Sequence, residues 1–120
     1  MRLRDIAETL HCHILCGDEY TGREVDTCCS SDLMEDVMSF SRPGTLLCTG
    51  QLDHKVVRTA VLCELGGILL VRGCKPDSAA VLEADSENIP VLVTGLGMFD
   101  ANGMLYGLGL RGSYWPKGRI

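Results

Sequence analysis

The sequence contains no long apolar run and no recognisable secretion signal. None of its apolar stretches approaches the roughly 20 residues that a helix needs to cross a membrane. The opening residues, MRLRDIAETLHC, lack the apolar segment and small-residue cleavage site of a signal peptide. We therefore expect a cytoplasmic protein that does not act in a membrane.

Positive charge is also scarce. The formal net charge is −5, and Arg111, Lys117 and Arg119 place +3 on the last ten residues, which leaves −8 for residues 1–110. A body this acidic repels phosphate backbones, so nucleic acid is not an expected partner. The short basic end is more typical of a frayed terminus than of a nucleic-acid-binding arm.

The chain has no catalytic motif that a sequence alone would reveal. It contains neither the GxSxG elbow of many hydrolases nor the GxxxxGK[ST] phosphate loop. Ser30 and Ser31 have no histidine close by in the sequence to act as a base. We therefore favour a non-catalytic protein, although the histidines and scattered carboxylates leave open an active site assembled by the fold.

Cysteine, by contrast, is abundant. The seven cysteines are an odd number, and they lie inside apolar runs rather than in turns. Disulfide frameworks of small secreted proteins usually show the opposite features. We predict free thiols in a reducing compartment.

Helical and extended patterns alternate along the chain. A length of 120 residues with 46% apolar residues fits one globular domain. Apolar residues recur at helical spacing in five stretches, and short apolar runs lie between them. We predict helices over residues 3–10, 32–41, 52–65, 77–84 and 98–108, and extended segments over residues 11–16, 25–29, 45–50, 68–73 and 91–95.

Several residues mark where these helices begin. Ser31 or Asp32 is placed to cap the second helix, and Glu35 follows Asp32 at capping-box spacing. Asp53 is placed to cap the third helix, which has the strongest apolar stripe. The last helix is the weakest, because Gly103 and Gly107 interrupt it.

Repeated strand–helix units with uninterrupted apolar strands predict the fold class. They are typical of an α/β protein with helices on both faces of the sheet. We predict a three-layer α/β/α sandwich with a mainly parallel sheet of about five strands, all running in the same direction. Residues 1–110 form this domain, and residues 111–120 form a flexible C-terminal tail.

The stretch HCHILC at residues 11–16 has the highest density of metal-binding and redox-active side chains. On a strand, alternation places His11, His13 and Leu15 on one face and the remaining three residues on the other. Cys12 and Cys16 would lie about 13 Å apart at roughly 3.3 Å per residue, too far for one metal ion. We favour a structural role for these cysteines as small hydrophobes.

A redox or metal-binding protein remains the alternative hypothesis. It would use side chains of the first strand together with a pair of adjacent cysteines in the second extended segment. The fold would have to place these two segments next to each other. Adjacent residues on a strand point to opposite faces, which counts against this pair. The residues of this alternative are His11, Cys12, His13, Cys28 and Cys29.

The turns that follow three predicted strands suggest a ligand site. In open parallel sheets, ligands bind beyond the carboxyl ends of the strands, and a helix start offers free N–H groups to an anion. The alternative is ordinary turn chemistry with no ligand. The predicted binding residues are Thr49, Gly50, Gln51 and His54 after one strand, Arg72 and Lys75 after the next, and Thr94 and Gly95 after the last.

Several blocks in a fixed order resemble the DRTGG domain family. These blocks are GREV, SDLMEDVM, TGQLDHKVVRTAVLCELGGILLVRG and IPVLVTG, and the resemblance runs from about residue 3 to residue 110. Arg23 and Val25 fit the naming motif, and Asp32-Leu33 fit the helix start that follows it. Gly22 and the DTC of residues 26–28 depart from the motif.

The resemblance implies a compact α/β domain similar to the N-terminal domain of HPr kinase. The family includes stand-alone bacterial proteins and modules within phosphotransacetylases and some CBS-domain pyrophosphatases. It implies a regulatory or ligand-sensing role, often as a homodimer, with an adenine nucleotide or another anionic metabolite as the ligand. No other cofactor and no metal is expected.

Partner contacts and loop anchors complete these expectations. Arg23 and Asp32 are expected to orient a loop, because arginine forms fixed bidentate hydrogen bonds. Homodimerisation or docking on a protein partner would use apolar side chains that leave the core. The residues named for this contact patch are Met34, Met38, Phe40, Met98 and Phe99.

Overall fold

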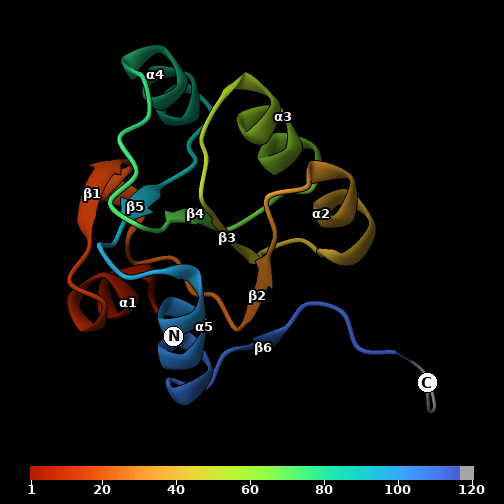
Figure 1. Cartoon of the computed structure of the whole chain (residues 1–120). Helices are drawn as coiled ribbons and strands as arrows, with labels where there is room; N and C mark the ends of the chain where they lie inside the picture. Colours follow the sequence, from red (N-terminus) through yellow and green to blue (C-terminus); the bar gives the residue numbers. More distant parts are fainter. Residues whose placement is uncertain (117–120) are drawn as a thin grey trace.

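The computed structural model describes residues 1–116 (Figure 1). Among these residues, no helix is both long enough and apolar enough to cross a bilayer. The elements in chain order are α1 (Leu3–Thr9), β1 (His13–Cys16), the 3-10 turn η1 (Asp18–Tyr20), β2 (Thr27–Ser30), α2 (Met34–Phe40), β3 (Leu46–Thr49), α3 (His54–Leu62), β4 (Gly67–Leu70), α4 (Ser78–Ser86), β5 (Val91–Val93), α5 (Met98–Gly107) and β6 (Arg111–Gly112).

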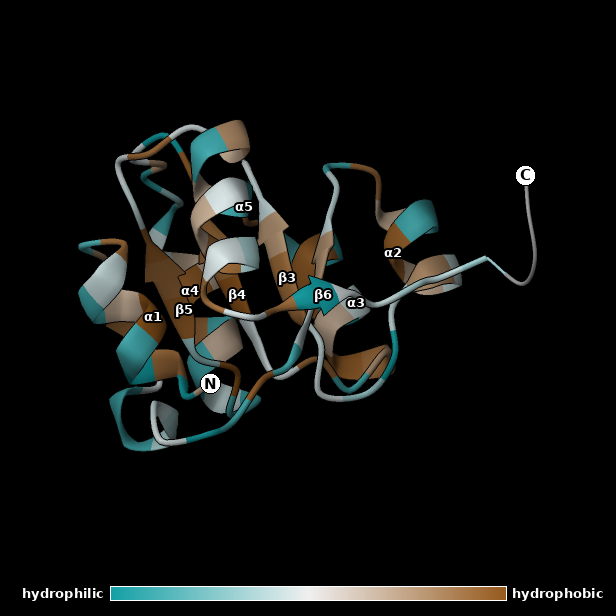
Figure 2. Ribbon diagram, turned by 90° about the horizontal axis from the view of Figure 1, so that it is seen from below, coloured by the Kyte–Doolittle hydropathy of each residue, from teal (hydrophilic) through white to brown (hydrophobic). Residues whose placement is uncertain are grey.

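The strands form one mixed, mostly parallel sheet in the order β1-β5-β4-β3-β2-β6. Helices α2, α3 and α4 contribute to the core on one face, and α1 and α5 contribute to the core on the other. Every residue of β3, β4 and β5 is buried, which explains the uninterrupted apolar runs of these strands. Figure 2 shows these apolar strands at the centre, between the helices. The predicted α/β architecture is confirmed.

The direction of the first strand was predicted wrongly. β1 pairs with β5 antiparallel, whereas the other neighbouring strands pair in parallel. The reason lies in the connection from β1 to β2. Residues 17–26 contain the short turn η1 and no crossover helix, and a parallel arrangement normally needs such a crossover. The end of β1 and the start of β2 therefore lie at the same end of the strands, which is the end where β3, β4 and β5 also begin.

A β-bulge in β1 also changes the predicted alternation. His13 and Ile14 pair with Val93 and Leu92, but the register then shifts so that Cys16 pairs with Val91. Cys16 consequently joins the core on the α4 face, where Leu15 also packs. Strict alternation predicts Cys16 and Cys12 on the same face of the sheet. In the structure Cys12 packs against the core on the α1 and α5 face, so the bulge separates the two cysteines.

The helix starts agree with the predictions at one site and differ at another. Asp53 caps α3 by accepting a hydrogen bond from the Val56 N–H at 2.9 Å, as predicted. α2 begins at Met34 behind Leu33, which makes no side-chain cap. Asp32 does not cap this helix, because its carboxylate is engaged with the turn after β3.

The sheet continues past the predicted domain boundary at residue 110. Arg111 and Gly112 form β6 and pair with β2. The Ser113 hydroxyl then donates to the Phe40 carbonyl at 2.7 Å, and the ring of Tyr114 meets the Phe40 ring edge to face. Of the predicted tail, residues 117–120 lie outside the described part of the chain.

The structure separates the residues named for one contact patch. Met34 is buried in the core on the α2 face, while Met38 and Phe40 of that helix are exposed. Phe99 is exposed on α5, the helix that covers the opposite face of the sheet. These side chains therefore do not form a single surface.

We expect Gly103→Ala to stabilise the protein by roughly 0.5–1 kcal/mol. Gly103 lies inside α5, and a Cβ at this position would have no heavy atom within 4 Å. Alanine therefore lowers the entropy cost of folding without a clash. Thermal unfolding followed by circular dichroism would show a melting temperature raised by a few degrees.

Gly109→Ala is the matched control for this substitution. Gly109 is equally open but has a φ of +110°, which a residue with a side chain adopts only at a cost. We expect it to lower the melting temperature. Equal effects of the two substitutions would contradict this explanation.

Candidate functional site

The turns after β3, β4 and β5 meet at the carboxyl edge of the sheet. The Val71 N–H donates to the Thr49 carbonyl at 3.2 Å, and the Gly73 N–H donates to the Thr94 carbonyl at 2.9 Å. Thr49 and Thr94 are both buried. The fold thus places Thr49 and Thr94 at one edge of the sheet, whereas ligand binding by the turn residues stays a prediction.

The turn at residues 49–51 already holds a carboxylate of the chain. Asp32 Oδ1 accepts hydrogen bonds from the Thr49 hydroxyl at 2.8 Å and from the Gly50 N–H at 2.7 Å. The Gln51 side-chain amide donates to the Asp32 carbonyl at 2.8 Å. The donors predicted for an external anion therefore have an internal partner.

These contacts stabilise the ionised form of Asp32. The Gly50 N–H, then the Thr49 hydroxyl and the nearby Arg72 charge, lower the pKa of Asp32 against the effect of burial. The Arg72 guanidinium lies directly over Gly50, where a side chain would collide with it. Asp32, Gly50 and Arg72 thus form one compact polar cluster.

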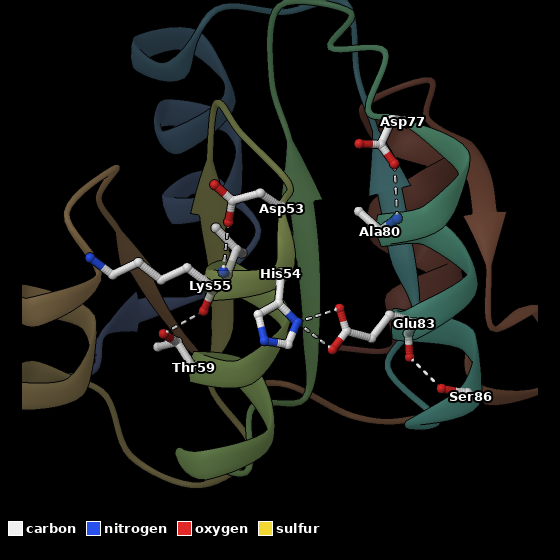
Figure 3. Close-up of polar contacts among 9 residues, drawn as sticks. Asp53, His54, Lys55, Thr59, Asp77, Ala80, Glu83 and Ser86 are labelled. Carbon is white, nitrogen blue, oxygen red and sulfur yellow. Dashed lines mark hydrogen bonds and ion pairs between the residues drawn. The ribbon is translucent and has the colours of Figure 1, made fainter.

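The His54 ring takes part in a contact between two helices and makes no hydrogen bond to these turns. Its Nδ1 donates to the Glu83 carboxylate of α4 at 2.8 Å, and its side chain is 75% exposed. Figure 3 shows this pair between α3 and α4, with Asp53 and Asp77 at the starts of the two helices. The structure therefore does not bring His54 to the other predicted ligand residues.

A cleft of about 570 Å³ opens beside β1 at the carboxyl edge. We call it the edge cleft. Its lining residues come from the turn before β1, from β1 itself, from the turn between β4 and α4, from α4, and from the end of β5 with the turn that follows it. Figure 1 shows how β1 and α4 lie beside each other. The lining residues of the edge cleft are His11, His13, Leu15, Gly73, Cys74, Lys75, Pro76, Val81, Val93, Thr94 and Gly95.

The antiparallel direction of β1 creates this cleft. His13 pairs with Val93, so the start of β1 lies beside the end of β5. In an all-parallel sheet His11 and His13 would lie at the opposite edge from Lys75. The structure brings together two groups of residues that sequence analysis had assigned to separate hypotheses.

The edge cleft contains only part of the predicted ligand set. Lys75, Thr94 and Gly95 line it, whereas Thr49, Gly50, Gln51, His54 and Arg72 do not. The Thr94 hydroxyl donates to the Leu10 carbonyl at 2.8 Å. Within residues 1–116, the side chains of His11, His13 and Lys75 make no hydrogen bond or ion pair, so they are free to contact a ligand.

The apolar wall of the cleft was missed by sequence reasoning. Leu15 and Val81 form part of this wall, and Pro76 and Val93 line the same space. Alternation along β1 already placed Leu15 on the face of His11 and His13. The signal for Val81 was absent, because only the packing of α4 beside β1 brings it there.

Burial raises the pKa of four cysteines well above the usual value of a thiol. Burial raises the pKa of Cys12 to about 11, and burial followed by the Asp85 charge raises the pKa of Cys16 to about 11. Burial likewise raises the pKa of Cys28 to about 11 and that of Cys48 to about 12. At neutral pH these thiols are poor nucleophiles and poor metal ligands.

The cysteine pair of the alternative metal or redox hypothesis is divided between the two faces of the sheet. Cys28 packs against the core on the α1 and α5 face, and the adjacent Cys29 packs against the core on the other face. In the part of the chain that the structure describes, no three His, Cys, Asp or Glu side chains come together to hold a metal ion.

Arg23 and Val25 anchor the loop before β2. The Arg23 guanidinium donates to the Gly66 carbonyl at 3.0 Å and to the Asn88 carbonyl at 3.3 Å, and it lies over the Tyr20 ring. Val25 is buried in the core. These contacts tie the loop to the residues that precede β4 and β5.

Comparison with known proteins identifies a family and a fold. A model of the DRTGG domain matches residues 5–107. The CBS and DRTGG domains of the regulatory region of a Clostridium perfringens pyrophosphatase, crystallised with its activator diadenosine tetraphosphate, match with a TM-score of 0.70 at 17% identity. The match covers 87% of this chain and 45% of that one, so the chain spans less than half of its structural relative. No curated protein matches. Because the family model spans most of the sequence, the chain belongs to the DRTGG domain family.

Proposed function

We propose that this protein is a non-catalytic regulatory domain that senses a small anionic metabolite, with an adenine nucleotide as the leading ligand class. Membership of the DRTGG family supports a regulatory role. The similar region of the pyrophosphatase is regulatory and was crystallised with its activator, diadenosine tetraphosphate. On this proposal the domain acts by homodimerisation or by docking on a protein partner.

The edge cleft is the observation that carries the proposal. Its volume of about 570 Å³ lies within the range of roughly 300–1,000 Å³ typical of small-molecule sites. Two imidazoles and the Lys75 ammonium supply groups for an anion, and Leu15 and Val81 supply an apolar wall for a ring. This combination suits a ligand with both an anionic group and a flat apolar body.

The anion contacts are assigned to His11, His13 and Lys75 rather than to the turn at residues 49–51. Asp32 occupies the Gly50 N–H and the Thr49 hydroxyl, so a ligand would have to displace it there. In the edge cleft, by contrast, no side-chain hydrogen bond or ion pair within residues 1–116 engages the donor side chains.

Association would cover apolar side chains that the domain leaves in solvent. Phe99 and Trp115 are 89% and 84% exposed, and Leu82 is also well exposed. Exposed apolar side chains mark an interaction surface where they form a contiguous patch. Of these three, Leu82 lies on α4, the helix that also lines the edge cleft. Binding of the ligand at the edge cleft, next to α4 and Leu82, would then change the strength of association.

We expect Lys75→Ala to weaken nucleotide binding by about ten- to a hundredfold. Loss of one charge-assisted hydrogen bond corresponds to roughly 1.5–3 kcal/mol, and each 1.4 kcal/mol is a factor of ten. Isothermal titration calorimetry with AMP, ATP, diadenosine tetraphosphate and inorganic phosphate would measure this effect. Light scattering on the same samples would report whether the ligand changes the oligomeric state.

Lys55→Ala is the matched control for this experiment. Lys55 is an exposed lysine of α3 that pairs with Glu35 at 2.9 Å, away from the edge cleft. Its replacement should leave nucleotide affinity unchanged. Absence of heat with every nucleotide, or equal loss of affinity in both variants, would overturn the ligand-sensing proposal.

A further inference from the structure

The edge cleft continues along β1 into a second hollow. This second hollow has a volume of about 330 Å³ and lies between the end of β1, η1 and α4. Leu15 and Val81 line both spaces, so the two hollows adjoin between β1 and α4, and we call them together the β1–α4 groove. The remaining lining residues of the second hollow are Cys16, Gly17, Asp18, Glu19, Leu82 and Asp85.

The two ends of the β1–α4 groove have opposite chemistry. At the carboxyl edge of the sheet lie two imidazoles and the Lys75 ammonium. At the other end lie three carboxylates, from Asp18, Glu19 and Asp85. These three carboxylates line the hollow together with Cys16, and after burial the Asp85 charge and then those of Asp18 and Glu19 raise the pKa of its thiol.

Neither charged end is neutralised by the chain itself. Among the described residues, the ion pairs are His54–Glu83 and Lys55–Glu35. Lys75 therefore has no carboxylate partner there, and the three carboxylates have no cationic partner. All three carboxylates are exposed hydrogen-bond acceptors, so a donor group supplied from outside can bind to them.

The dimensions favour a small molecule that reaches both ends. The strand β1 has four residues, and its first and last residues lie about 10 Å apart at roughly 3.3 Å per residue. The shared wall of Leu15 and Val81 lies between the charged ends and offers only apolar contacts. A nucleoside monophosphate has comparable length, with its phosphate and its base at opposite ends.

We propose that the β1–α4 groove binds a small phosphate ester that carries an amino group at its opposite end. The phosphate contacts His11, His13 and Lys75, a flat middle part packs on Leu15 and Val81, and the amino group donates N–H to the carboxylates of Asp18, Glu19 and Asp85. This inference rests on the proposed function and adds a requirement for the far end of the ligand. It also disfavours long polyphosphates, because Lys75 is the one permanent cation among the described lining residues.

A comparison of AMP with IMP tests this requirement. The two nucleotides share the phosphate and the ribose, but IMP has a carbonyl oxygen in place of the exocyclic amino group of AMP. Carboxylates accept hydrogen bonds from the amino group and repel the carbonyl oxygen. We expect AMP to bind about tenfold more tightly than IMP, a difference of roughly 1.4 kcal/mol in binding free energy.

The variant Asp85→Asn should reduce this preference for AMP, because its amide can donate to the carbonyl of IMP. Asp100→Asn is the control, since Asp100 lies on α5 on the opposite face of the sheet. Calorimetric titration of the full chain measures both affinities. The control should leave the AMP preference unchanged.

The outcomes separate the two proposals. Equal affinities for AMP and IMP with loss of binding in Lys75→Ala would overturn the amino-group requirement and leave the ligand-sensing function standing. Inorganic phosphate binding as tightly as AMP would also overturn the requirement, because only the cationic end would then be used. Absence of binding by any nucleotide would overturn both proposals.

Discussion

Replacing Gly17 with alanine is expected to lower the free energy of unfolding by about 3 kcal/mol or more. Gly17 follows β1 with a φ of +79°, in the left-handed region that side chains disfavour. A Cβ there would lie 2.5 Å from the Cα of Pro90, a backbone atom just before β5. The backbone contact between β1 and β5 would have to open to admit the methyl group.

Urea unfolding followed by circular dichroism would measure this loss. Gly22→Ala is the matched control in the same loop, because a Cβ there would meet no atom within 4 Å and φ is not positive. We expect the control to change stability by at most about 0.5 kcal/mol. A Gly17→Ala protein as stable as the control would refute the proposed close contact.

Asp32→Ala should destabilise the protein by about 1–2 kcal/mol. The substitution leaves the buried Thr49 hydroxyl and the Gly50 N–H without their shared acceptor, and each lost bond to a carboxylate is worth roughly 1.5–3 kcal/mol before solvent is considered. Asp32 is exposed, so water replaces part of this interaction and we reduce the expected loss accordingly. Asp26→Ala, at an exposed aspartate in the loop before β2, is the control and should be near neutral.

The contribution of Asp32 should depend on pH with a definite sign. Because the folded protein lowers the pKa of Asp32, its stabilisation is fully present above the unfolded value of about 3.9. It is lost as the pH falls through the lower pKa of the folded state. The difference in unfolding free energy between wild type and Asp32→Ala should therefore be constant near pH 7 and shrink below about pH 4. A difference that grows on acidification would contradict this assignment.

Sequence patterns were reliable where local chemistry decides the structure. The cap of α3 by Asp53 was predicted because a short carboxylate before an apolar stripe satisfies free N–H groups within its own turn. The buried strands β3 and β4 were predicted from uninterrupted apolar runs, because strands covered on both faces have no polar side. The ordered blocks of the sequence also sufficed to identify the DRTGG family.

The candidate site was predicted only in part, because its two halves come from distant segments. Lys75 and Thr94 were recognised as residues beyond the ends of strands, and His11 and His13 as neighbours on one face of a strand. Nothing in the sequence indicated that these groups share a cleft. The turn at residues 49–51 was predicted to bind a ligand. The sequence did not reveal that Asp32 fills this turn, because its approach depends on the pairing of β2 with β3.

By itself the sequence determined the number and order of most elements, the sides that face the core and the family. These follow from apolar periodicity and capping, which act within a few residues. Only the tertiary structure decided the antiparallel direction of β1, the bulge that turns Cys16 to the α4 face and the partner of Asp32. Each of these depends on hydrogen bonds and close packing between segments far apart in the chain, whose free energy no local pattern encodes.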